Sequence, residues 1–543
     1  MRLYNAGSRV GALAVAALAA AGMGPALPGT AAASVTSAVA PVSWGTCADS
    51  DLDGVPAAQR TKFSCAVYVV PMDYAHPENG SINLAMMRRT ANDTAHRIGS
   101  LFLNPGGPGG TGYQLPIAAS TRIFQPEVLD RFDLVGFDPR GVGRSTALRC
   151  FTTQEDHDKV FANVAAIPLT GKEIRDATAA NRTYGQYCGR LAGPLIDHMS
   201  TADVVRDLDR MRAAVGDDKL NYVGFSYGTL IGATYATMFP GSTRAIVIDG
   251  NVDPELRLSN GLEYDRQRAG GFEASLDALL KRCDAAGAAC AFGGGARAKF
   301  DDIRESLKRN GPVRLPNDAT VSYSTLITTV SSVLYRVELL ESLTKLMQAV
   351  YEAVHPPLGQ QPDAVGADVT ALLSSAGNIR WDALPDTAYV TDDSYSAVNC
   401  SDKPFWQPAI ATPAIADSWD ATMPTFGREL AWGDPAVCPL WPVHDAAPYR
   451  GPWNHRTTNP VLVIGNYHDP ATQYEFARRM SRELGNARLL TVDAFGHCVL
   501  GKSLCADRIA ARYLTELAMP DPGTVCAPNV QPFPDASPTS SRP

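Results

Sequence analysis

The sequence predicts an α/β protein that is built on a mainly parallel sheet and interrupted by a large, mostly helical insertion. Short apolar runs typical of strands alternate with helix-compatible segments between residues 101 and 248. The alternation returns between residues 461 and 517, whereas residues 256–456 show helical stretches and Pro-rich connections without it. Alternating strands and helices favour a parallel sheet that is covered on both faces. We therefore expect one α/β domain whose two parts flank the insertion.

The first part of this domain, residues 44–255, carries six predicted strands and two predicted helices. The strands are apolar or β-rich runs next to turn-forming residues, at 66–70, 82–89, 101–103, 132–137, 220–224 and 245–248. The helix at 201–215 has apolar side chains at helical spacing, and the helix at 229–239 is apolar enough to be buried.

The remaining elements follow in two blocks. The insertion, residues 256–456, contains predicted helices at 272–282, 298–308 and 323–354. The second part of the domain, residues 457–526, is predicted to have strands at 461–464 and 488–492 and helices at 473–484 and 506–517. Residues 527–543 are rich in Pro and Ser and are expected to form a tail.

Residues 1–33 are predicted to be a secretory signal peptide. Two arginines come first, a run of small apolar residues follows at 10–21, and residues 29–34 (GTAAAS) offer a small-residue cleavage site. A membrane anchor needs about 20 apolar residues, and the glycines and proline at 22–25 break the run earlier. We therefore expect an exported, extracellular protein without a membrane span after signal removal.

Composition and motifs exclude two classes of function. The 48 Lys and Arg residues are outnumbered by 56 Asp and Glu, so the net charge is −8. A nucleic-acid-binding protein needs a clustered positive surface, and no basic run is present, so no nucleic-acid partner is expected. The nine His residues include no H-E-x-x-H pair, which leaves a zinc peptidase without support. No metal or organic cofactor is expected, and the oligomeric state is not predicted.

A nucleophile is predicted at Ser226. Residues 224–228 (GFSYG) fit the pattern G-x-S-x-G, and they stand between a strand-like run and a helix-compatible run. In that context the pattern is typical of a sharp strand-to-helix turn that exposes the serine hydroxyl. The alternative, an ordinary Gly-rich turn, is disfavoured by the same context.

A base and an acid are predicted to follow the nucleophile in the order that this architecture uses. His497 follows the strand at 488–492 and is the predicted base, and Asp469 follows the strand at 461–464 and is the predicted acid. Both stand where a loop leaves the carboxyl end of a strand, the edge at which such sheets bind ligands. Asp249, after the strand at 245–248, is the best rival acid; Asp493 and His468 are weaker candidates, and His468 is expected to line the site.

An oxyanion hole is predicted from the Gly-rich segment 104–110 (NPGGPGG), which follows an early strand. Backbone N–H groups that glycines leave accessible can stabilise a developing negative charge. We expect one donor from Gly107 and the other from Tyr227, the residue after the nucleophile. A phosphate-binding turn is disfavoured because neither G-x-G-x-x-G nor G-K-[ST] is present.

Taken in order, four segments resemble the α/β-hydrolase peptidases of the proline iminopeptidase family, above all its secreted bacterial tripeptidyl aminopeptidases. These segments are the turn at 106–109, the stretch 138–145 (DPRGVGRS), the elbow at 224–228 and the C-terminal block with Asp469 and His497. The resemblance covers residues 44–526 and is weakest in the insertion. It implies an α/β-hydrolase fold with Ser226 as nucleophile, Asp469 as acid and His497 as base. Gln473 and Cys498 depart from the family pattern, which often has Pro and Gly there.

The function expected from these residues is that of an exported serine exopeptidase. It would release short peptides, which the resemblance implies are tripeptides, from substrates with free N-termini. The alternatives are a carboxylesterase or lipase with the same triad, a proline iminopeptidase that releases single residues, and a catalytically silent binding protein.

The eleven cysteines are expected to form disulfides in an exported protein. Sequence neighbours suggest five pairs: Cys47 with Cys65, Cys150 with Cys188, Cys283 with Cys290, Cys400 with Cys438, and Cys505 with Cys526. Cys498 would then be free, because the family resemblance offers it no partner. The open alternative pairs Cys498 with Cys505 and leaves Cys526 over.

The insertion leaves the sheet immediately after a strand end, on the edge where Ser226 is expected. It is therefore predicted to cover the active site and to present carboxylates to the substrate's α-amino group, whose charge is costly to bury unpaired. The candidates are Glu255, Glu263, Asp265, Asp392 and Asp393, and the sequence does not choose among them. The alternative is an insertion that only adds stability.

Overall fold

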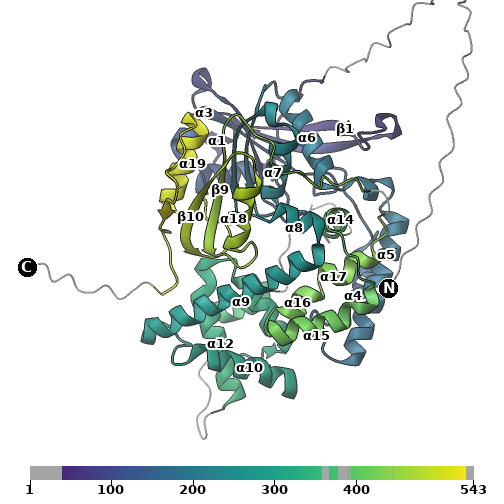
Figure 1. Cartoon of the computed structure of the whole chain (residues 1–543), viewed down its shortest axis with the longest axis vertical. Coiled ribbons are helices and arrows are strands. Elements are labelled where there is room, and N and C mark those ends of the chain that lie inside the picture. Colours follow the sequence, from purple (N-terminus) through teal and green to yellow (C-terminus); the bar gives the residue numbers. More distant parts are fainter. Residues whose placement is uncertain (1–38, 357–365, 377–388, 390–392, 444–445, 534–543) are drawn as a thin grey trace, which may run out of the picture. The chain divides into compact units, whose positions relative to one another are not determined.

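Nine strands form a single sheet in the computed structural model, which describes residues 39–356, 366–376, 389, 393–443 and 446–533. Their order across the sheet is β1-β2-β4-β3-β5-β6-β9-β10-β11. β2 runs antiparallel to its neighbours β1 and β4, and all other neighbouring strands are parallel (Figure 1). The predicted mainly parallel sheet is confirmed. The predicted signal peptide, Asp392 and residues 534–543 of the predicted tail lie outside the described residues.

All predicted strands are present, and several are longer than predicted. β9 continues to His468 because Asn466 and His468 still pair with β10, although neither residue is apolar. β3, β4 and β5 are buried along their whole length, as expected for central strands of a covered parallel sheet. The strands are β1 (Phe63–Pro71), β2 (Ser81–Arg89), β3 (Gly99–Asn104), β4 (Phe132–Phe137), β5 (Leu220–Phe225), β6 (Thr243–Asp249), β9 (Val461–His468), β10 (Ala487–Phe495) and β11 (Val525–Cys526).

Helices cover both faces of the sheet. Val223 and Val247 belong to an apolar cluster that includes residues of three helices, α2 (Leu115–Arg122), α3 (Pro126–Arg131) and α19 (Leu504–Glu516). Their sequence neighbours Tyr222 and Ile248 point to the opposite face, where they lie against Gly232 of α7. Two further helices contact α7 or the strands, α6 (Thr201–Ala214) and α18 (Tyr474–Glu483), and α7 itself spans Gly228–Met238. A short helix, α1 (Ala57–Arg60), precedes β1.

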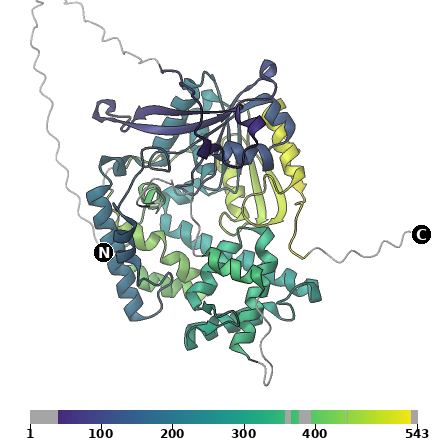
Figure 2. The same ribbon diagram turned by 180° about the vertical axis from the view of Figure 1, so that it is seen from behind.

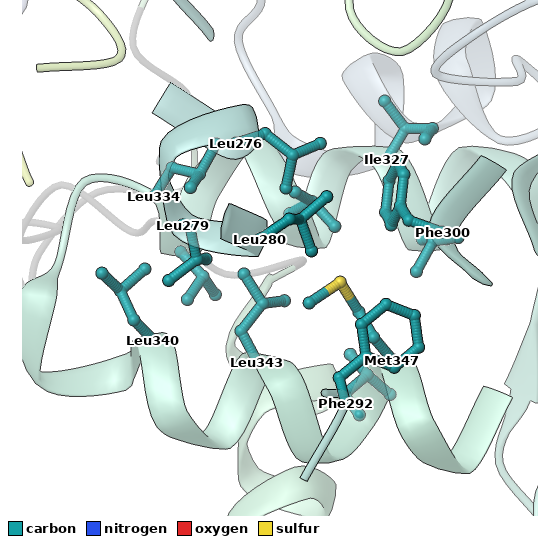
Figure 3. Close-up of a cluster of buried hydrophobic side chains, with 14 of the residues drawn as sticks. Leu276, Leu279, Leu280, Phe292, Phe300, Ile327, Leu334, Leu340, Leu343 and Met347 are labelled. Atoms are coloured by element: carbon teal, nitrogen blue, oxygen red, sulfur yellow. The ribbon is translucent and has the colours of Figure 1, made fainter. Parts of the chain in front are cut away.

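The insertion is mostly helical, as predicted, and has an apolar core of its own. In Figure 3, leucines of α9 face Phe300 of α10 and Met347 of α12, and all of these side chains are buried. Besides a small hairpin, β7 (Val313–Arg314) and β8 (Thr320–Val321), its elements are α8 (Pro254–Ser259), α9 (Gly261–Ala286), α10 (Ala296–Asn310), α11 (Tyr323–Val333), α12 (Leu340–Val354), α13 (Ala367–Ala376), α14 (Asp393–Asp402), α15 (Thr412–Thr422), α16 (Gly427–Ala431) and α17 (Asp434–Val437).

The prediction of a single helix at 323–354 is wrong, because the helix is interrupted between α11 and α12. α11 ends at Val333 and α12 begins at Leu340. Between them, the Tyr335 carbonyl accepts a hydrogen bond from the His497 N–H at 2.9 Å rather than from a helical neighbour. A contact with a residue more than 150 positions away therefore opposes the helical periodicity of this segment.

The helices α1 to α5, all before the elbow, were not predicted; the two that lie beside the insertion are α4 (Gln154–Phe161) and α5 (Gly171–Leu191). α5 contacts α17 of the insertion, and Figure 2 shows these blue helices beside the green ones. A Cβ added at Gly185 of α5 would lie 2.3 Å from the Leu440 carbonyl oxygen, so glycine permits this close approach. We propose that the cover over the sheet edge comprises residues 256–456 together with α4 and α5.

Five disulfides join the cysteine pairs suggested by sequence neighbours, including Cys505 with Cys526. Cys498 is the free cysteine among the described residues. The predicted pairing is confirmed, and the alternative bond between Cys498 and Cys505 is not formed. None of the helices in the described part of the chain combines the length and the hydrophobicity of a membrane span.

Candidate active site

The predicted site residues follow four strands at one edge of the sheet. Gly107 follows β3, Ser226 follows β5, Asp469 follows β9 and His497 follows β10. All four strands are parallel and separated from one another only by β6, so their carboxyl ends lie at one edge. The topology thus brings together residues that are up to 390 positions apart in the sequence.

The elbow holds Ser226 in an unusual backbone conformation. Its φ is +54°, a left-handed value that non-glycine residues rarely adopt. The turn is tight because glycines replace side chains on both sides: a Cβ at Gly224 would lie 2.3 Å from the Gly228 carbonyl oxygen. A Cβ at Gly106 would lie 2.8 Å from the Ser226 Cβ, so the Gly-rich turn after β3 packs directly against the elbow. Strain of this kind is typical of functional sites.

Asp469 and His497 form a buried hydrogen-bonded pair. The His497 Nδ1 lies 3.0 Å from Oδ1 and 2.9 Å from Oδ2 of Asp469. Asp469 also accepts hydrogen bonds from the backbone N–H groups of Ala471 and Thr472, and from the Thr472 hydroxyl. Burial lowers the pKa of an imidazole, but the Asp469 carboxylate outweighs this effect and holds the pKa of His497 well above 6.5. The carboxylate is thus fixed and stabilises the charged imidazole.

The rival acid, Asp249, has a different set of contacts. Its Oδ2 accepts hydrogen bonds of 2.8 Å from the backbone N–H groups of Val499 and Leu500, in the loop that carries His497. Burial raises the pKa of Asp249 to about 6. The structure thus brings Asp469 to the imidazole, while Asp249 binds the loop beyond it.

The two weaker candidates lie elsewhere. His468 stacks on Phe495 at 4.3 Å between ring centroids, and its Nε2 lies 3.8 Å from the Asp493 carboxylate. Both residues line a separate surface hollow, not the cavity of Ser226. The expectation that His468 lines the site is therefore wrong, because His468 still pairs with β10 at Phe495 and its side chain faces that hollow.

A cavity of about 420 Å³ joins the predicted residues. Ser226, His497, Gly107 and Tyr227 all line it. The His497 Nε2 is buried and has no hydrogen-bond partner among the described residues, so it is available to a group within the cavity. Within the same part of the chain, neither the Gly107 nor the Tyr227 N–H donates a hydrogen bond to another residue.

Comparison with known proteins assigns this chain to a family. Family models described as "TAP-like protein" and "alpha/beta hydrolase fold" match residues 423–526 and 99–274. The chain is 30% identical to the serine protease Hip1 of Mycobacterium tuberculosis, over 90% of this chain and 91% of that protein. It is also 30% identical to the tripeptidyl aminopeptidase of Streptomyces coelicolor, over 93% of this chain and 90% of that protein. The chain belongs to the TAP-like α/β-hydrolase family.

Membership of the TAP-like family makes this chain a serine hydrolase with aminopeptidases among its relatives. Carboxylesterase B of Mycobacterium tuberculosis is 30% identical as well, over 90% of each chain. Because differently named relatives are equally similar, identity alone does not choose between peptide and ester substrates.

One residue of this TAP-like hydrolase that the sequence did not indicate is Tyr335. It lies in the break between α11 and α12, where its carbonyl binds the His497 N–H. Its ring meets the imidazole edge-on, at 5.1 Å between centroids and 78° between planes. The insertion therefore holds the predicted base on two sides, and no local pattern around residue 335 could have indicated this.

The stretch 138–145, which carried part of the family resemblance, makes buried contacts with the backbone and with α6. Asp138 accepts hydrogen bonds from the backbone N–H groups of Tyr113 and Arg144, and so holds the chain three residues after the Gly-rich segment. Arg140 is fully buried and makes two hydrogen bonds to Asp207 of α6, at 2.7 and 2.8 Å. These charged residues bind one another and the backbone, so their role is structural.

Across the described ranges, no group of three His, Cys, Asp or Glu residues has the arrangement of metal ligands.

Proposed function

We propose that this TAP-like hydrolase is an exported serine exopeptidase that releases short peptides from free N-termini. Its cover would limit how many residues fit before the scissile bond. Its five disulfides agree with an oxidising compartment. The observation that carries the proposal is the pairing of Asp469 with His497 beside a strained Ser226, with the free Nε2 of His497 in the same covered cavity.

In the proposed mechanism, the Ser226 hydroxyl attacks the scissile carbonyl while His497 Nε2 takes its proton. Asp469 stabilises the imidazolium that forms, and the Gly107 and Tyr227 N–H groups stabilise the oxyanion. His497 then gives the proton to the leaving amine. Water, activated by His497, hydrolyses the acyl-enzyme and restores Ser226.

The four described carboxylates that the sequence offered for the α-amino group are engaged elsewhere or exposed. Asp265 is bound by Lys403 at 2.6 Å, and Asp393 accepts from two tyrosines and a backbone N–H. Glu263 binds Arg266 and Gln267, and Glu255 is exposed. A better candidate therefore has to be a buried carboxylate with an unused oxygen.

Glu429 meets that requirement. It lines a second cavity of about 370 Å³, which shares Arg268, Ser332, Tyr335 and Tyr395 with the cavity of Ser226. Its Oε1 accepts a hydrogen bond of 2.7 Å from Ser331, and its Oε2 is buried without a partner among the described residues. Burial raises the pKa of Glu429 to about 7, and an ammonium group would offset this cost. We propose Glu429 as the acceptor of the substrate amine.

The test compares a tripeptide anilide with its N-acetylated form. The proposal expects acetylation to lower kcat/KM at least about a hundredfold, which corresponds to about 2.7 kcal/mol. Glu429→Gln should lower kcat/KM for the free substrate and leave the acetylated one little changed, while Ser226→Ala should abolish turnover of both. Equal turnover of free and acetylated substrates would overturn the exopeptidase proposal.

The second candidate function is that of an esterase, which the equally similar carboxylesterase B favours. A short-chain ester assayed beside the tripeptide anilide separates the two functions. A kcat/KM for the ester that exceeds the value for the free anilide would favour the esterase. Identification of the released product by mass spectrometry separates tripeptide release from release of single residues.

A further inference from the structure

The cavity of Ser226 is lined by charges of one sign. Arg257, Arg268 and Arg336 line it, and no Asp or Glu side chain is among the described residues that do. The second cavity differs, because Asp265, Glu429 and Asp434 line it together with Arg268. A peptide that reached from one cavity into the other would therefore meet acidic groups at one end and cationic groups near the scissile bond.

Arg257 is the most deeply buried of the three arginines. It lies on α8, directly after β6, and is only 4% exposed. Its guanidinium lies over the rings of Tyr227 and Tyr264, 5.7 and 5.4 Å from their centroids, and donates to the Asn399 side chain. Its Nε is buried and has no hydrogen-bond partner in the described part of the chain.

No carboxylate forms an ion pair with Arg257 among the described residues. Burial lowers the pKa of Arg257, but Tyr264, Asp402 and Asp434 together hold it above its usual value. Both acids are bound elsewhere: Asp402 accepts hydrogen bonds from the Thr201 hydroxyl and N–H, and Asp434 binds Lys403. A buried charge without a carboxylate in contact is costly. The aromatic rings, one amide and the more distant carboxylates stabilise the charge of Arg257, but its Nε is left without a hydrogen-bond partner among the described residues.

The other two arginines differ in this respect. Arg268 has a carboxylate partner, because it lies 3.3 Å from Asp265. Arg336 is exposed, so water solvates its charge. Arg257 is thus the buried cation of this cavity that has no carboxylate in contact among the described residues, and an incoming anion could form an ion pair with it.

We propose that Arg257 binds a carboxylate of the substrate next to the scissile bond. This inference rests on the proposed hydrolysis at Ser226, and it adds a preference for acidic substrates. The carboxylate has two possible sources: an acidic side chain on the residue whose carbonyl is attacked, or the C-terminal carboxylate of a short peptide on the leaving side. Both offer a planar anion to the guanidinium.

The experiment has one arm for each source. In the first arm, kcat/KM is compared for Ala-Ala-Glu and Ala-Ala-Gln anilides, whose leaving group carries no carboxylate. In the second arm, tetra-alanine is compared with its C-terminal amide. The proposal expects a preference for the charged substrate of about tenfold or more in one arm, the size of a hydrogen bond to a charged group.

Two variants test whether Arg257 causes the preference for the charged substrate. Arg257→Gln should reduce the ratio to within about twofold of one, whereas Arg336→Gln, a change of the same charge at the exposed edge of the cavity, should leave it largely intact. Because each ratio is measured within one variant, a general loss of activity does not affect it.

Two results would overturn the proposal: charged and neutral substrates turned over equally in both arms by the wild-type enzyme, or a preference that survives in Arg257→Gln. The first result needs no variant, so it holds even where Arg257→Gln fails to fold. Failure of the exopeptidase proposal is distinct, since it shows as equal turnover of free and acetylated substrates, and the ratios can then be measured with acetylated ones.

Discussion

Two buried carboxylates, Asp249 and Asp469, reach the loop that carries His497, and their contacts differ. Asp469 binds the imidazole itself, whereas Asp249 binds the backbone N–H groups of Val499 and Leu500. The acid that orients the imidazole, Asp469, affects the proton transfer directly. The acid that binds the loop, Asp249, affects only the position of that loop. The two residues should therefore respond differently to the same substitution.

Asp469→Asn should lower kcat by about three to four orders of magnitude, because the imidazole loses the acceptor that orients it and stabilises its charge. Asp249→Asn is the matched control. It should stay within about tenfold of the wild-type kcat, since the amide oxygen can still accept from the loop. Steady-state kinetics on a tripeptide anilide measure both. If Asp249→Asn is the more damaging change, Asp469 is not the acid.

The pH dependence of hydrolysis follows from the raised pKa of His497. His497 has to be neutral to take the proton of Ser226, so kcat/KM should rise with pH and reach half its plateau well above pH 6.5. A p-nitrophenyl ester without an amine is the suitable substrate, because its own protonation does not change over this range. A midpoint at or below 6.5 would contradict the assignment of His497 or its coupling to Asp469.

At the scale of elements, the insertion and the sheet meet at the break between α11 and α12. The apolar cluster of the insertion also contains two residues from outside it, Ala471 and Phe495, each two positions away from the predicted acid or base in the sequence. Tyr335, within the break, binds the His497 backbone and packs on its ring. The insertion thus contributes to the position of the base as well as to the cover.

Tyr335→Ala should lower kcat by between about tenfold and a hundredfold, because the imidazole loses the ring that limits its movement. Tyr335→Phe keeps the ring and should remain close to the wild-type kcat. Circular dichroism would establish that both variants are folded. If Phe and Ala cause equal losses, the hydroxyl rather than the ring matters, and the positioning role is wrong.

At the scale of the whole molecule, the described residues from Ala40 onward form one compact unit that five disulfides constrain locally. Each bond closes a loop of at most 38 residues, so none of them joins the two parts of the domain across the insertion. Those parts are held together by the strand pairing of β6 with β9 and by contacts such as that of Asp249 with the His497 loop.

Labelling of the denatured, non-reduced protein should modify Cys498 alone. Its thiol is half-buried and donates to the Asp249 carbonyl oxygen at 3.4 Å, while the other ten cysteines are paired. Peptide mapping by mass spectrometry would locate the label, and reduction should expose all eleven thiols. A label on Cys526, with Cys498 bonded to Cys505, would contradict the pairing.

The sequence by itself determined the strands of the sheet other than β11, the elbow at Ser226 and the positions of Asp469 and His497 at strand ends. These depend on local signals, namely apolar periodicity, turn-forming residues and the rule that parallel strands end at one edge. Only the tertiary structure decided which carboxylate meets His497, where the helix predicted at 323–354 breaks, and which charges face the cavity. The roles inferred for Tyr335, Glu429 and Arg257 depend on residues far away in the chain, either because they contact them or because a buried polar atom has no partner among them. Local sequence patterns carry no information about such contacts.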